Sequence, residues 1–179
     1  MIKSFCVDYG DPDSESQESK DNKVLITCAD NYYDNDNSVS IWAHGDSNGF
    51  VLANDKEINT TDKFMYFLAN ESDVYLENQI TLEPTLVIMH SCSTGKEGGF
   101  AQRMSEILDI VIVAPSAEIS VIRKTAEEEG VKNGGTWNVY YKGKKVDSIE
   151  GTKQPIFKNP KQTIETYKTI YNKLYENQE

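Results

Sequence analysis

The apolar residues of this chain gather into short runs, and segments with helical periodicity lie between them. Strands are predicted at 38–43, 86–91 and 110–114, and the second run is continuous, as is typical of a parallel strand buried on both faces. The segments 61–69 and 100–108 carry apolar side chains at the i, i+3, i+4 spacing of helices. This alternation predicts an α/β fold with a mainly parallel central sheet. The expected buried stripes are Phe64, Phe67 and Leu68 in the first helix and Phe100, Met104, Ile107 and Leu108 in the second.

The N-terminal part of the chain predicts two further strands with polar connections. These strands are expected at 3–8 and 23–28. The stretch 10–22 between them is acidic and lacks periodicity, so we expect a long surface loop there. The segment 30–37 is rich in Asn and Asp and predicts a turn-rich connection to the strand at 38–43.

The C-terminal part of the chain predicts a hairpin followed by a helix. We expect an extended segment at 118–122 and then a charged stretch around 127–129. Residues 137–146 form strand-like runs on either side of a Lys-Gly-Lys turn, which predicts the hairpin. A terminal helix is predicted over 161–175. Its expected buried stripe is Ile164, Tyr167, Ile170, Tyr171 and Leu174.

Length and composition favour a single domain over residues 1–179. The chain has 179 residues, and its hydrophobic content of 38% is clustered into runs, unlike the diluted pattern of disordered chains. No stretch approaches the roughly 20 apolar residues of a membrane helix. Residues 1–8 resemble a first strand and not a signal peptide. We therefore expect no membrane partner, no Sec-type export, and a cytoplasmic location in the producing cell.

The charge of the chain is acidic but unevenly distributed. The formal net charge of −11 opposes general nucleic-acid binding. Residues 1–122 carry 7 basic and 21 acidic side chains, whereas residues 123–179 carry 11 basic and 8 acidic ones. A lysine surplus of this kind is more often a solvated face than an anion or partner site. Both interpretations remain open.

The cysteine and aspartate spacings predict neither a disulfide framework nor a metal site. Cys6, Cys28 and Cys92 are odd in number and irregularly spaced, and the first two lie in strand-like runs typical of buried thiols. Asp34 and Asp36 resemble the opening of a calcium loop, but the glycine and glutamate that such a loop needs are missing. We expect no bound metal and no cofactor.

Two side chains that could act in catalysis follow two of the predicted parallel strands. Cys92 ends the run at 86–91 and precedes a glycine-bearing loop, whereas His44 ends the run at 38–43. The carboxyl ends of parallel strands meet at one edge of a sheet, which is where α/β folds place their chemistry. A catalytic thiol needs an imidazolium or a helix N-terminus to favour its thiolate form. The pair is therefore a candidate Cys/His dyad.

Neither residue would point to catalysis on its own. A lone cysteine at a strand end is more often buried filler, and a lone His-Gly is a weaker signal still. His90 shares a strand face with Cys92 by period-two alternation, and we expect it to be a hydrogen-bonded core histidine. Glycines at Gly45, Gly95 and 98–99 would let backbone N–H groups turn inward as donors to an oxyanion.

At these residues the sequence resembles the caspase-like cysteine peptidases of clan CD. The resemblance lies in His44-Gly45, in Ser91-Cys92-Ser-Thr-Gly95, and in the runs 100–104 and 111–116, and it covers roughly residues 38–122. The resemblance is strongest to the cysteine protease domains of bacterial toxins and effectors. The resemblance implies a three-layer sandwich with a mainly parallel central sheet and a C-terminal hairpin plus helix.

The resemblance also implies roles for individual residues. Cys92 would be the nucleophile, and His44 would protonate the leaving amine. The backbone N–H groups of Gly45 and Cys92 would form the oxyanion hole. Ala114 and Ser116 would border the substrate's P1 pocket, and the hairpin carrying Trp137 would form a flap over it.

Partners are implied in the same way. The substrate would be a protein or peptide, and a toxin would have a cognate inhibitor or immunity protein. Some toxin relatives are activated by inositol hexakisphosphate, for which the lysine-rich C-terminal third would be the site. Delivery to a target cell would then use a route independent of a signal peptide. The caspase pentapeptide around the cysteine and an arginine set for a P1 aspartate are both absent.

Three interpretations follow from the sequence. The first is a cysteine endopeptidase that uses His44 and Cys92, as a bacterial effector toxin or a self-processing protease. The second is a non-catalytic caspase-like interaction module that engages a partner through its acidic face. The third is a thiol acyltransferase or amidase on the same sheet.

Overall fold

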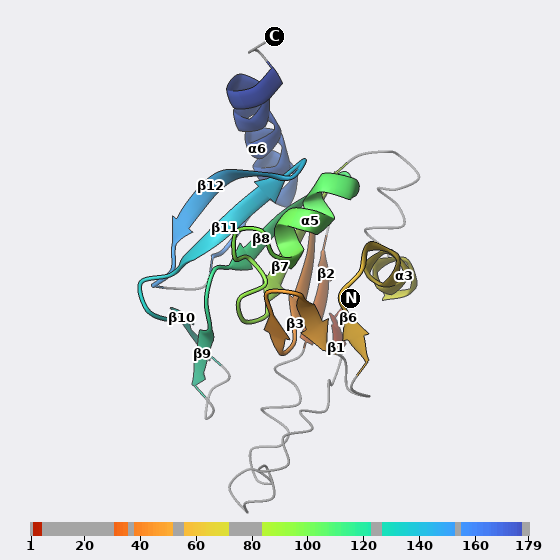
Figure 1. The fold of residues 1–179 in the computed structure, drawn as a ribbon, viewed down its shortest axis with the longest axis vertical. Helices are drawn as coiled ribbons and strands as arrows, with labels where there is room; N and C mark the ends of the chain where they lie inside the picture. Colours follow the sequence, from red (N-terminus) through yellow and green to blue (C-terminus); the bar gives the residue numbers. More distant parts are fainter. Residues whose placement is uncertain are drawn as a thin grey trace, which may run out of the picture.

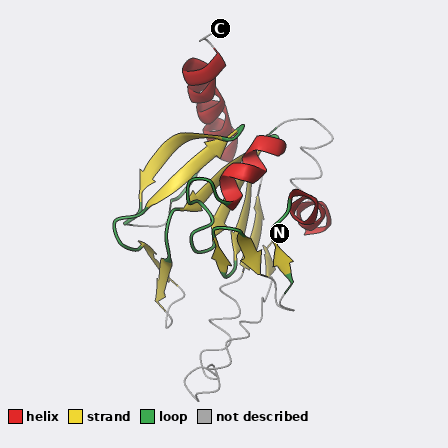
Figure 2. Ribbon diagram, viewed as in Figure 1, coloured by secondary structure: helices red, strands yellow, loops and turns green. Residues whose placement is uncertain are grey.

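Within the part of the chain that the structure describes, a mixed central sheet is joined by two small accessory sheets and three helices (Figures 1 and 2). This computed structural model describes residues 2–4, 31–35, 38–51, 56–71, 84–122, 127–152 and 155–176. The central sheet has seven strands within these ranges. In spatial order they are β1 (Ile2–Ser4), β2 (Asn31–Asn35), β3 (Ser38–Trp42), β7 (Thr85–His90), β8 (Ile110–Pro115), β11 (Thr136–Tyr141) and β12 (Lys144–Glu150).

The parallel part of the central sheet is confined to its middle. Strand β3 pairs in parallel with β7, and β7 pairs in parallel with β8. The pairings of β1 with β2, β2 with β3, β8 with β11, and β11 with β12 are all antiparallel. The prediction of an α/β fold is confirmed, but the sheet is mixed and not mainly parallel, because antiparallel strands extend it on both sides of the parallel core.

Helices cover both faces of this sheet. α3 (Thr61–Glu71) and α5 (Phe100–Ile107) contribute to the apolar core on one face, and α6 (Pro160–Tyr175) contributes to the core on the other. Strand β7 serves both cores, since alternate residues point to opposite faces. Val87 and Met89 join the first core, whereas Leu86 and Ile88 join the second. All four are at most 7% exposed, as the continuous apolar run predicted.

Two accessory sheets lie outside the central sheet. One contains β4 (Gly45–Asp46), β5 (Gly49–Val51) and β6 (Glu57–Ile58), and it follows directly after β3 in the chain. The other pairs β9 (Ile119–Ile122) with β10 (Glu127–Val131) in antiparallel fashion. The first of these sheets begins one residue after His44, so its position bears on the candidate site.

Two polar segments form strands that the sequence pattern did not predict. Residues 31–35 form β2, although this segment was predicted as a turn-rich connection, and residues 127–131 form β10 instead of a plain charged stretch. Both strands obtain their hydrogen bonds from a partner strand, which compensates for a low intrinsic strand preference. The predicted strand at 23–28 and loop at 10–22 lie outside the described residues.

The helical stripes are confirmed except near the helix ends. Phe64, Phe67 and Leu68 are buried as predicted. Ile107 is 64% exposed because α5 ends there, and the extended backbone at Leu108 carries the next side chain into the core instead. In α6, Ile164 and Tyr167 are buried, Ile170 and Tyr171 pack partly against the second core, and Leu174 is exposed. Figure 1 shows why, since the C-terminal part of α6 projects beyond the sheet.

The helices that the structure describes include none with the length and apolar character needed to cross a lipid bilayer.

Four phenylalanine rings join the first accessory sheet to the helices. Phe50 of β5 makes edge-to-face contacts with Phe64, Phe67 and Phe100, with ring centroids 5.3–6.1 Å apart. Phe64 and Phe100 also meet edge to face at 5.2 Å. Edge-to-face pairs of this kind add to the free energy of burial. The cluster therefore holds the accessory sheet that follows His44 against the helical layer.

We expect Phe50→Ala to lower the free energy of unfolding by about 3–5 kcal/mol, because it leaves a cavity among three rings. Urea denaturation measures the change. The control is Ile156→Ala, since Ile156 is 80% exposed and its truncation should cost less than about 0.5 kcal/mol. Equal losses in the two variants would contradict this account of the core.

Candidate functional site

The parallel pairing of β3 with β7 brings the two candidate residues to one edge of the sheet. The last register pair is Trp42 beside His90, and the Ala43 N–H donates a hydrogen bond to the His90 carbonyl at 3.4 Å. His44 and Cys92 each lie two residues beyond that pair. The two strand ends therefore deliver the imidazole and the thiol to the same edge, as the sequence predicted.

The segments that carry these two residues touch each other. A Cβ atom added to Gly45 would lie 2.9 Å from the Ser91 Cβ and 3.0 Å from the Thr94 Cγ2. Real Cβ atoms almost never approach so closely, so only glycine allows this contact. The His44-Gly45 segment therefore packs directly on the turn that contains Cys92.

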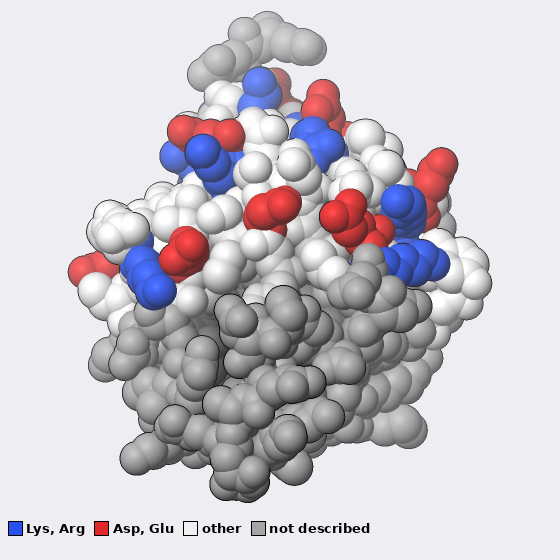
Figure 3. Space-filling view, turned by 60° about the horizontal axis from the view of Figure 1, so that its bottom comes forward, with Lys and Arg blue, Asp and Glu red and all other residues white. Residues whose placement is uncertain are grey.

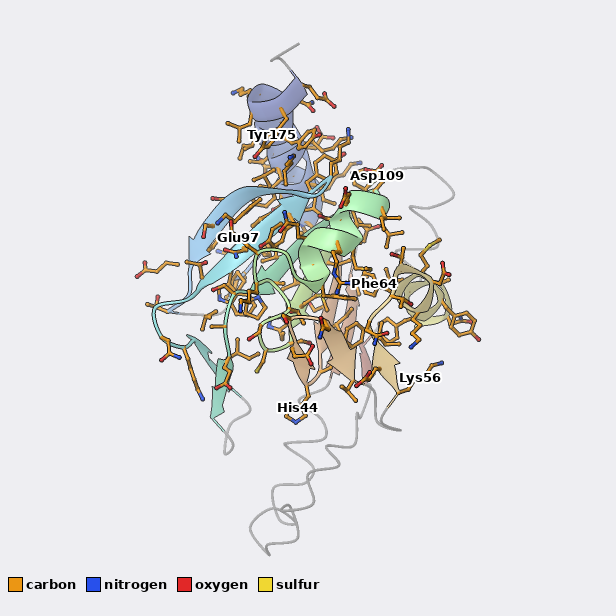
Figure 4. The ribbon with its side chains drawn as sticks, viewed as in Figure 1. His44, Lys56, Phe64, Glu97, Asp109 and Tyr175 are labelled. Atoms are coloured by element: carbon orange, nitrogen blue, oxygen red, sulfur yellow. The ribbon has the colours of Figure 1, made fainter. Side chains whose placement is uncertain are left out.

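The two candidate side chains differ in exposure. His44 is exposed, and Figure 4 shows it pointing away from the sheet at the strand ends. Cys92 is half-buried and is a free thiol. Cys6 and Cys28, which were predicted to be buried strand cysteines, lie outside the described residues.

A tight turn presents Cys92. The Ser91 carbonyl accepts hydrogen bonds from the Thr94 N–H at 3.3 Å and from the Thr94 Oγ1 at 2.8 Å. Ser93 has a φ of 58°, a left-handed conformation that a non-glycine residue seldom adopts. The Ser93 N–H donates to the Ala117 carbonyl at 3.0 Å, which holds this conformation in place. Strained residues of this type concentrate at functional sites.

Backbone N–H groups are available beside the thiol. No backbone oxygen among the described residues accepts a hydrogen bond from the Cys92 N–H. Gly45 lies opposite Phe50, and the bond from the Val51 N–H to the His44 carbonyl marks this as a non-hydrogen-bonded pair. In such a pair the N–H points away from the partner strand. Neither N–H group is therefore used within the β4–β5 hairpin or the Cys92 turn.

Gly95 fastens the far end of the Cys92 turn to the sheet. Its N–H donates to the Pro115 carbonyl at 2.8 Å, and a Cβ at this position would collide with the Ala114 carbonyl. Its own carbonyl accepts hydrogen bonds from the Asn138 Nδ2 at 2.9 Å and the Tyr140 hydroxyl at 2.7 Å. Asn138 and Tyr140 were missed from the sequence. An asparagine in the middle of an apolar strand was the available signal.

The residues predicted to border a substrate pocket are mostly buried. Ala114 is 0% exposed and lies behind Gly95. Ser116 is half-buried and exchanges hydrogen bonds with the Thr136 backbone, at 2.8 Å and 2.9 Å. Trp137 is 0% exposed in the second core. The hairpin that carries Trp137 consists of β11 and β12 of the central sheet, and its role as a flap stays a prediction.

His90 occupies the core position that the sequence predicted. It is 3% exposed, and its ring meets Trp137 edge to face with centroids 5.5 Å apart. The imidazole thus packs against the second core beneath the strand edge. His44 is the candidate histidine at the surface.

A cavity of about 260 Å³ adjoins the segment that follows His44. Its lining includes Asp46, Phe50 and Glu57 of the accessory sheet and Arg103 of α5. Arg103 donates to the Asn48 carbonyl at 3.1 Å. No local sequence pattern predicts this hollow, since it forms between an accessory hairpin and a helix that are distant in the chain.

Some of the described C-terminal lysines form ion pairs with acidic side chains. Lys145 pairs with Glu97 at 2.9 Å, Lys142 pairs with Glu176 at 3.1 Å, and Lys132 pairs with Glu118 at 3.5 Å. On the face that Figure 3 presents, basic and acidic side chains lie interspersed. This arrangement favours the interpretation of the lysine surplus as a solvated face.

Within the described ranges, no group of three or more His, Cys, Asp or Glu side chains is placed to hold a metal ion. Asp36 of the calcium-like spacing is outside those ranges.

We expect Gly95→Ala to destabilise the fold by about 1–3 kcal/mol, because the new Cβ meets the backbone of β8, which cannot yield. The same variant should change the rate at which iodoacetamide alkylates Cys92, as followed by peptide mass spectrometry. The control is Gly134→Ala, which has a φ of 69° and open space around the new Cβ. It should cost about 1 kcal/mol through its backbone alone and leave the alkylation rate unchanged. Matching alkylation rates in the two variants would refute the role assigned to Gly95.

Comparison with known proteins identifies a family without an assigned activity. A search of curated proteins and a search of solved structures each found no match. A family model described as Domain of unknown function (DUF8616) matches residues 13–139, which is more than half of the chain and includes both His44 and Cys92. The chain therefore belongs to the DUF8616 family.

Proposed function

We propose that this protein is a cysteine endopeptidase in which Cys92 is the nucleophile and His44 is the proton donor and acceptor. The observation that carries the proposal is the contact between the His44-Gly45 segment and the Cys92 turn at the carboxyl edge of parallel strands. A thiol and an imidazole at adjacent strand ends are the elements of nucleophilic catalysis by cysteine. The left-handed Ser93, which presents the thiol at a turn, further supports the proposal.

The proposed reaction has two halves. The Cys92 thiolate attacks the carbonyl carbon of a peptide bond, and the resulting oxyanion accepts hydrogen bonds from the N–H groups of Cys92 and Gly45. The His44 imidazolium then donates its proton to the leaving nitrogen, the C–N bond breaks, and a thioester remains. Neutral His44 next takes a proton from water, which attacks the thioester. The products are a carboxylic acid and the regenerated thiolate.

The orientation of His44 bears on this mechanism. Its side chain points away from the sheet, so it must rotate to face the thiol. Substrate binding would select the inward rotamer.

The fold proposed to go with this activity is caspase-like. The parallel core of β3, β7 and β8, the layers of helices on both faces, and the antiparallel hairpin of β11 and β12 are compatible with that proposal. The structure departs from the expectation in the position of the hairpin, which is part of the central sheet. Trp137 itself is buried in the second core.

The second candidate is a non-catalytic interaction module. The outward orientation of His44 favours it, because an imidazole that never meets the thiol has no catalytic role. In that case the acidic surface of the chain would engage a partner. The experiment below separates the two candidates.

We expect Cys92→Ala to abolish cleavage of a mixed peptide library, because it removes the nucleophile. His44→Ala should lower the rate by about a hundredfold or more, as is typical when a general acid is lost. Fragments are identified by mass spectrometry, with and without inositol hexakisphosphate, and the wild-type fragments also reveal the P1 preference. Cleavage that persists in Cys92→Ala would contradict the proposal, and intact peptides under every condition would favour the interaction module.

We expect His90→Ala to lower the free energy of unfolding by about 2 kcal/mol, because it removes a ring packed against Trp137. Folded His90→Ala protein should retain most of the wild-type turnover. Thermal unfolding and the cleavage assay measure these two quantities. A well-folded His90→Ala protein without turnover would show that His90 and not His44 is the essential imidazole.

A further inference from the structure

We propose that Asn138 and Tyr140 of β11 are positioning residues for Cys92, which they hold in place through the carbonyl oxygen of Gly95. The catalytic part of this inference rests on the proposed peptidase function. Its structural part, the control of thiol geometry by β11, stands apart from that function and is tested separately.

Both donors reach the same oxygen from one strand. The Tyr140 hydroxyl donates to the Gly95 carbonyl at 2.7 Å, and the Asn138 Nδ2 donates to it at 2.9 Å. The two residues are two positions apart, so their side chains share a face of the sheet. Asn138 is 3% exposed and Tyr140 is 0% exposed, so water does not compete for the oxygen.

A second set of hydrogen bonds orients the Asn138 amide. Its Oδ1 accepts from the Thr136 Oγ1 at 2.7 Å and from the Ser148 Oγ at 3.2 Å. The Gly95 carbonyl can only accept a hydrogen bond, whereas the two hydroxyls can donate to the amide oxygen, and this fixes which end of the amide is the NH₂ group. That group therefore faces Gly95, and it also lies 3.4 Å from the Tyr140 hydroxyl.

The Tyr140 hydroxyl keeps its proton. Burial raises the pKa of this phenol, and the hydrogen bond from Asn138 offsets part of the increase. The folded state therefore favours the protonated form that donates to Gly95. This favourable contribution is present at neutral pH and is lost only as the pH rises through the raised pKa.

Polar side chains are costly at these positions. Asparagine is depleted in strands, and a buried amide without hydrogen bonds is strongly unfavourable. The network satisfies Asn138 and also the Gly95 carbonyl, which would otherwise be a buried acceptor without a donor. The Gly95 N–H is bound to Pro115, so the peptide groups on both sides of Gly95 are fixed to the sheet.

This fixation acts on the thiol through a short path. Thr94 closes the turn that starts at Ser91, Cys92 lies inside this turn, and Gly95 follows it directly. A displacement of about 1 Å at a reacting group costs as much as a hundredfold in rate. Other contacts from the hairpin are weaker, such as the Lys145 to Glu97 pair, whose side chains are 38% and 69% exposed. The two buried hydrogen bonds to the Gly95 carbonyl are therefore the main restraint that the hairpin places on the Cys92 loop.

The test uses Tyr140→Phe, which removes one hydroxyl and preserves the ring. The matched control is Tyr141→Phe, because the neighbouring hydroxyl donates to Asp109 at 3.1 Å and not to the Cys92 loop. Asn138→Leu removes the other donor at similar volume. The double variant Asn138→Leu/Tyr140→Phe leaves the Gly95 oxygen without either donor. Each variant is compared for peptide cleavage and for the rate of Cys92 alkylation by iodoacetamide.

We expect Tyr140→Phe to lower kcat about tenfold with KM within about twofold of wild type, and to slow the alkylation of Cys92. Tyr141→Phe should leave both rates within about twofold of wild type. The factor by which kcat falls in the double variant should exceed the product of the factors for the two single variants. Only the double variant leaves the Gly95 oxygen without either donor.

Tyr140→Phe and Tyr141→Phe proteins with the same alkylation rate and the same kcat would overturn the inference. A rise in KM alone would also overturn it, because that result assigns Tyr140 to substrate binding. If the wild-type protein cleaves no peptide, the proposed function fails while the alkylation comparison still decides the inference. Slower alkylation confined to the variants at Asn138 and Tyr140 would then uphold the positioning role without peptidase activity.

Discussion

Five residues of β3 pair in parallel with five of β7, from Ser38 beside Leu86 to Trp42 beside His90. Side chains in a strand alternate with a period of two, so a slip of one residue would reverse the faces of β3 and expose its buried residues. The apolar core that contains Val39 and Ile41 therefore enforces this register. Once the register is set, His44 and Cys92 must leave the sheet at the same edge. The placement of His44 and Cys92 at one edge of the sheet is a consequence of how the core packs.

A second constraint lies at Gly95, where the loop after β7 meets the rest of the sheet. Its backbone is bound on one side by Pro115 of β8 and on the other by Asn138 and Tyr140 of β11. These bonds join two strands, β8 and β11, to a single residue three positions after Cys92. The register delivers the thiol to the edge of the sheet, and Gly95 then fixes its orientation. A rigid support of this kind is what a catalytic group requires.

Much of this arrangement could be predicted from local patterns. The continuous run at 86–91 predicted a strand buried on both faces, and glycines after His44 and Cys92 marked the tight loops. Strands β2 and β10 were missed because their polar sequences become strands only through pairing with a partner. The contacts of Asn138 with Gly95 span 43 positions, and no local pattern encodes a contact of that separation. Likewise, the burial of Trp137 depends on the position of β11 in the sheet, which the hairpin motif alone does not specify.

The central claim is that His44 and Cys92 act as a pair, and the reactivity of the thiol tests it most directly. The measurement is the rate at which iodoacetamide labels each cysteine near pH 6, by peptide mass spectrometry, in wild-type and His44→Ala protein. The account predicts that Cys92 reacts much faster than Cys6 and Cys28, and that His44→Ala removes most of this advantage, since an imidazolium favours the thiolate. A Cys92 that reacts as slowly as Cys6, or that keeps its full rate without His44, would contradict it.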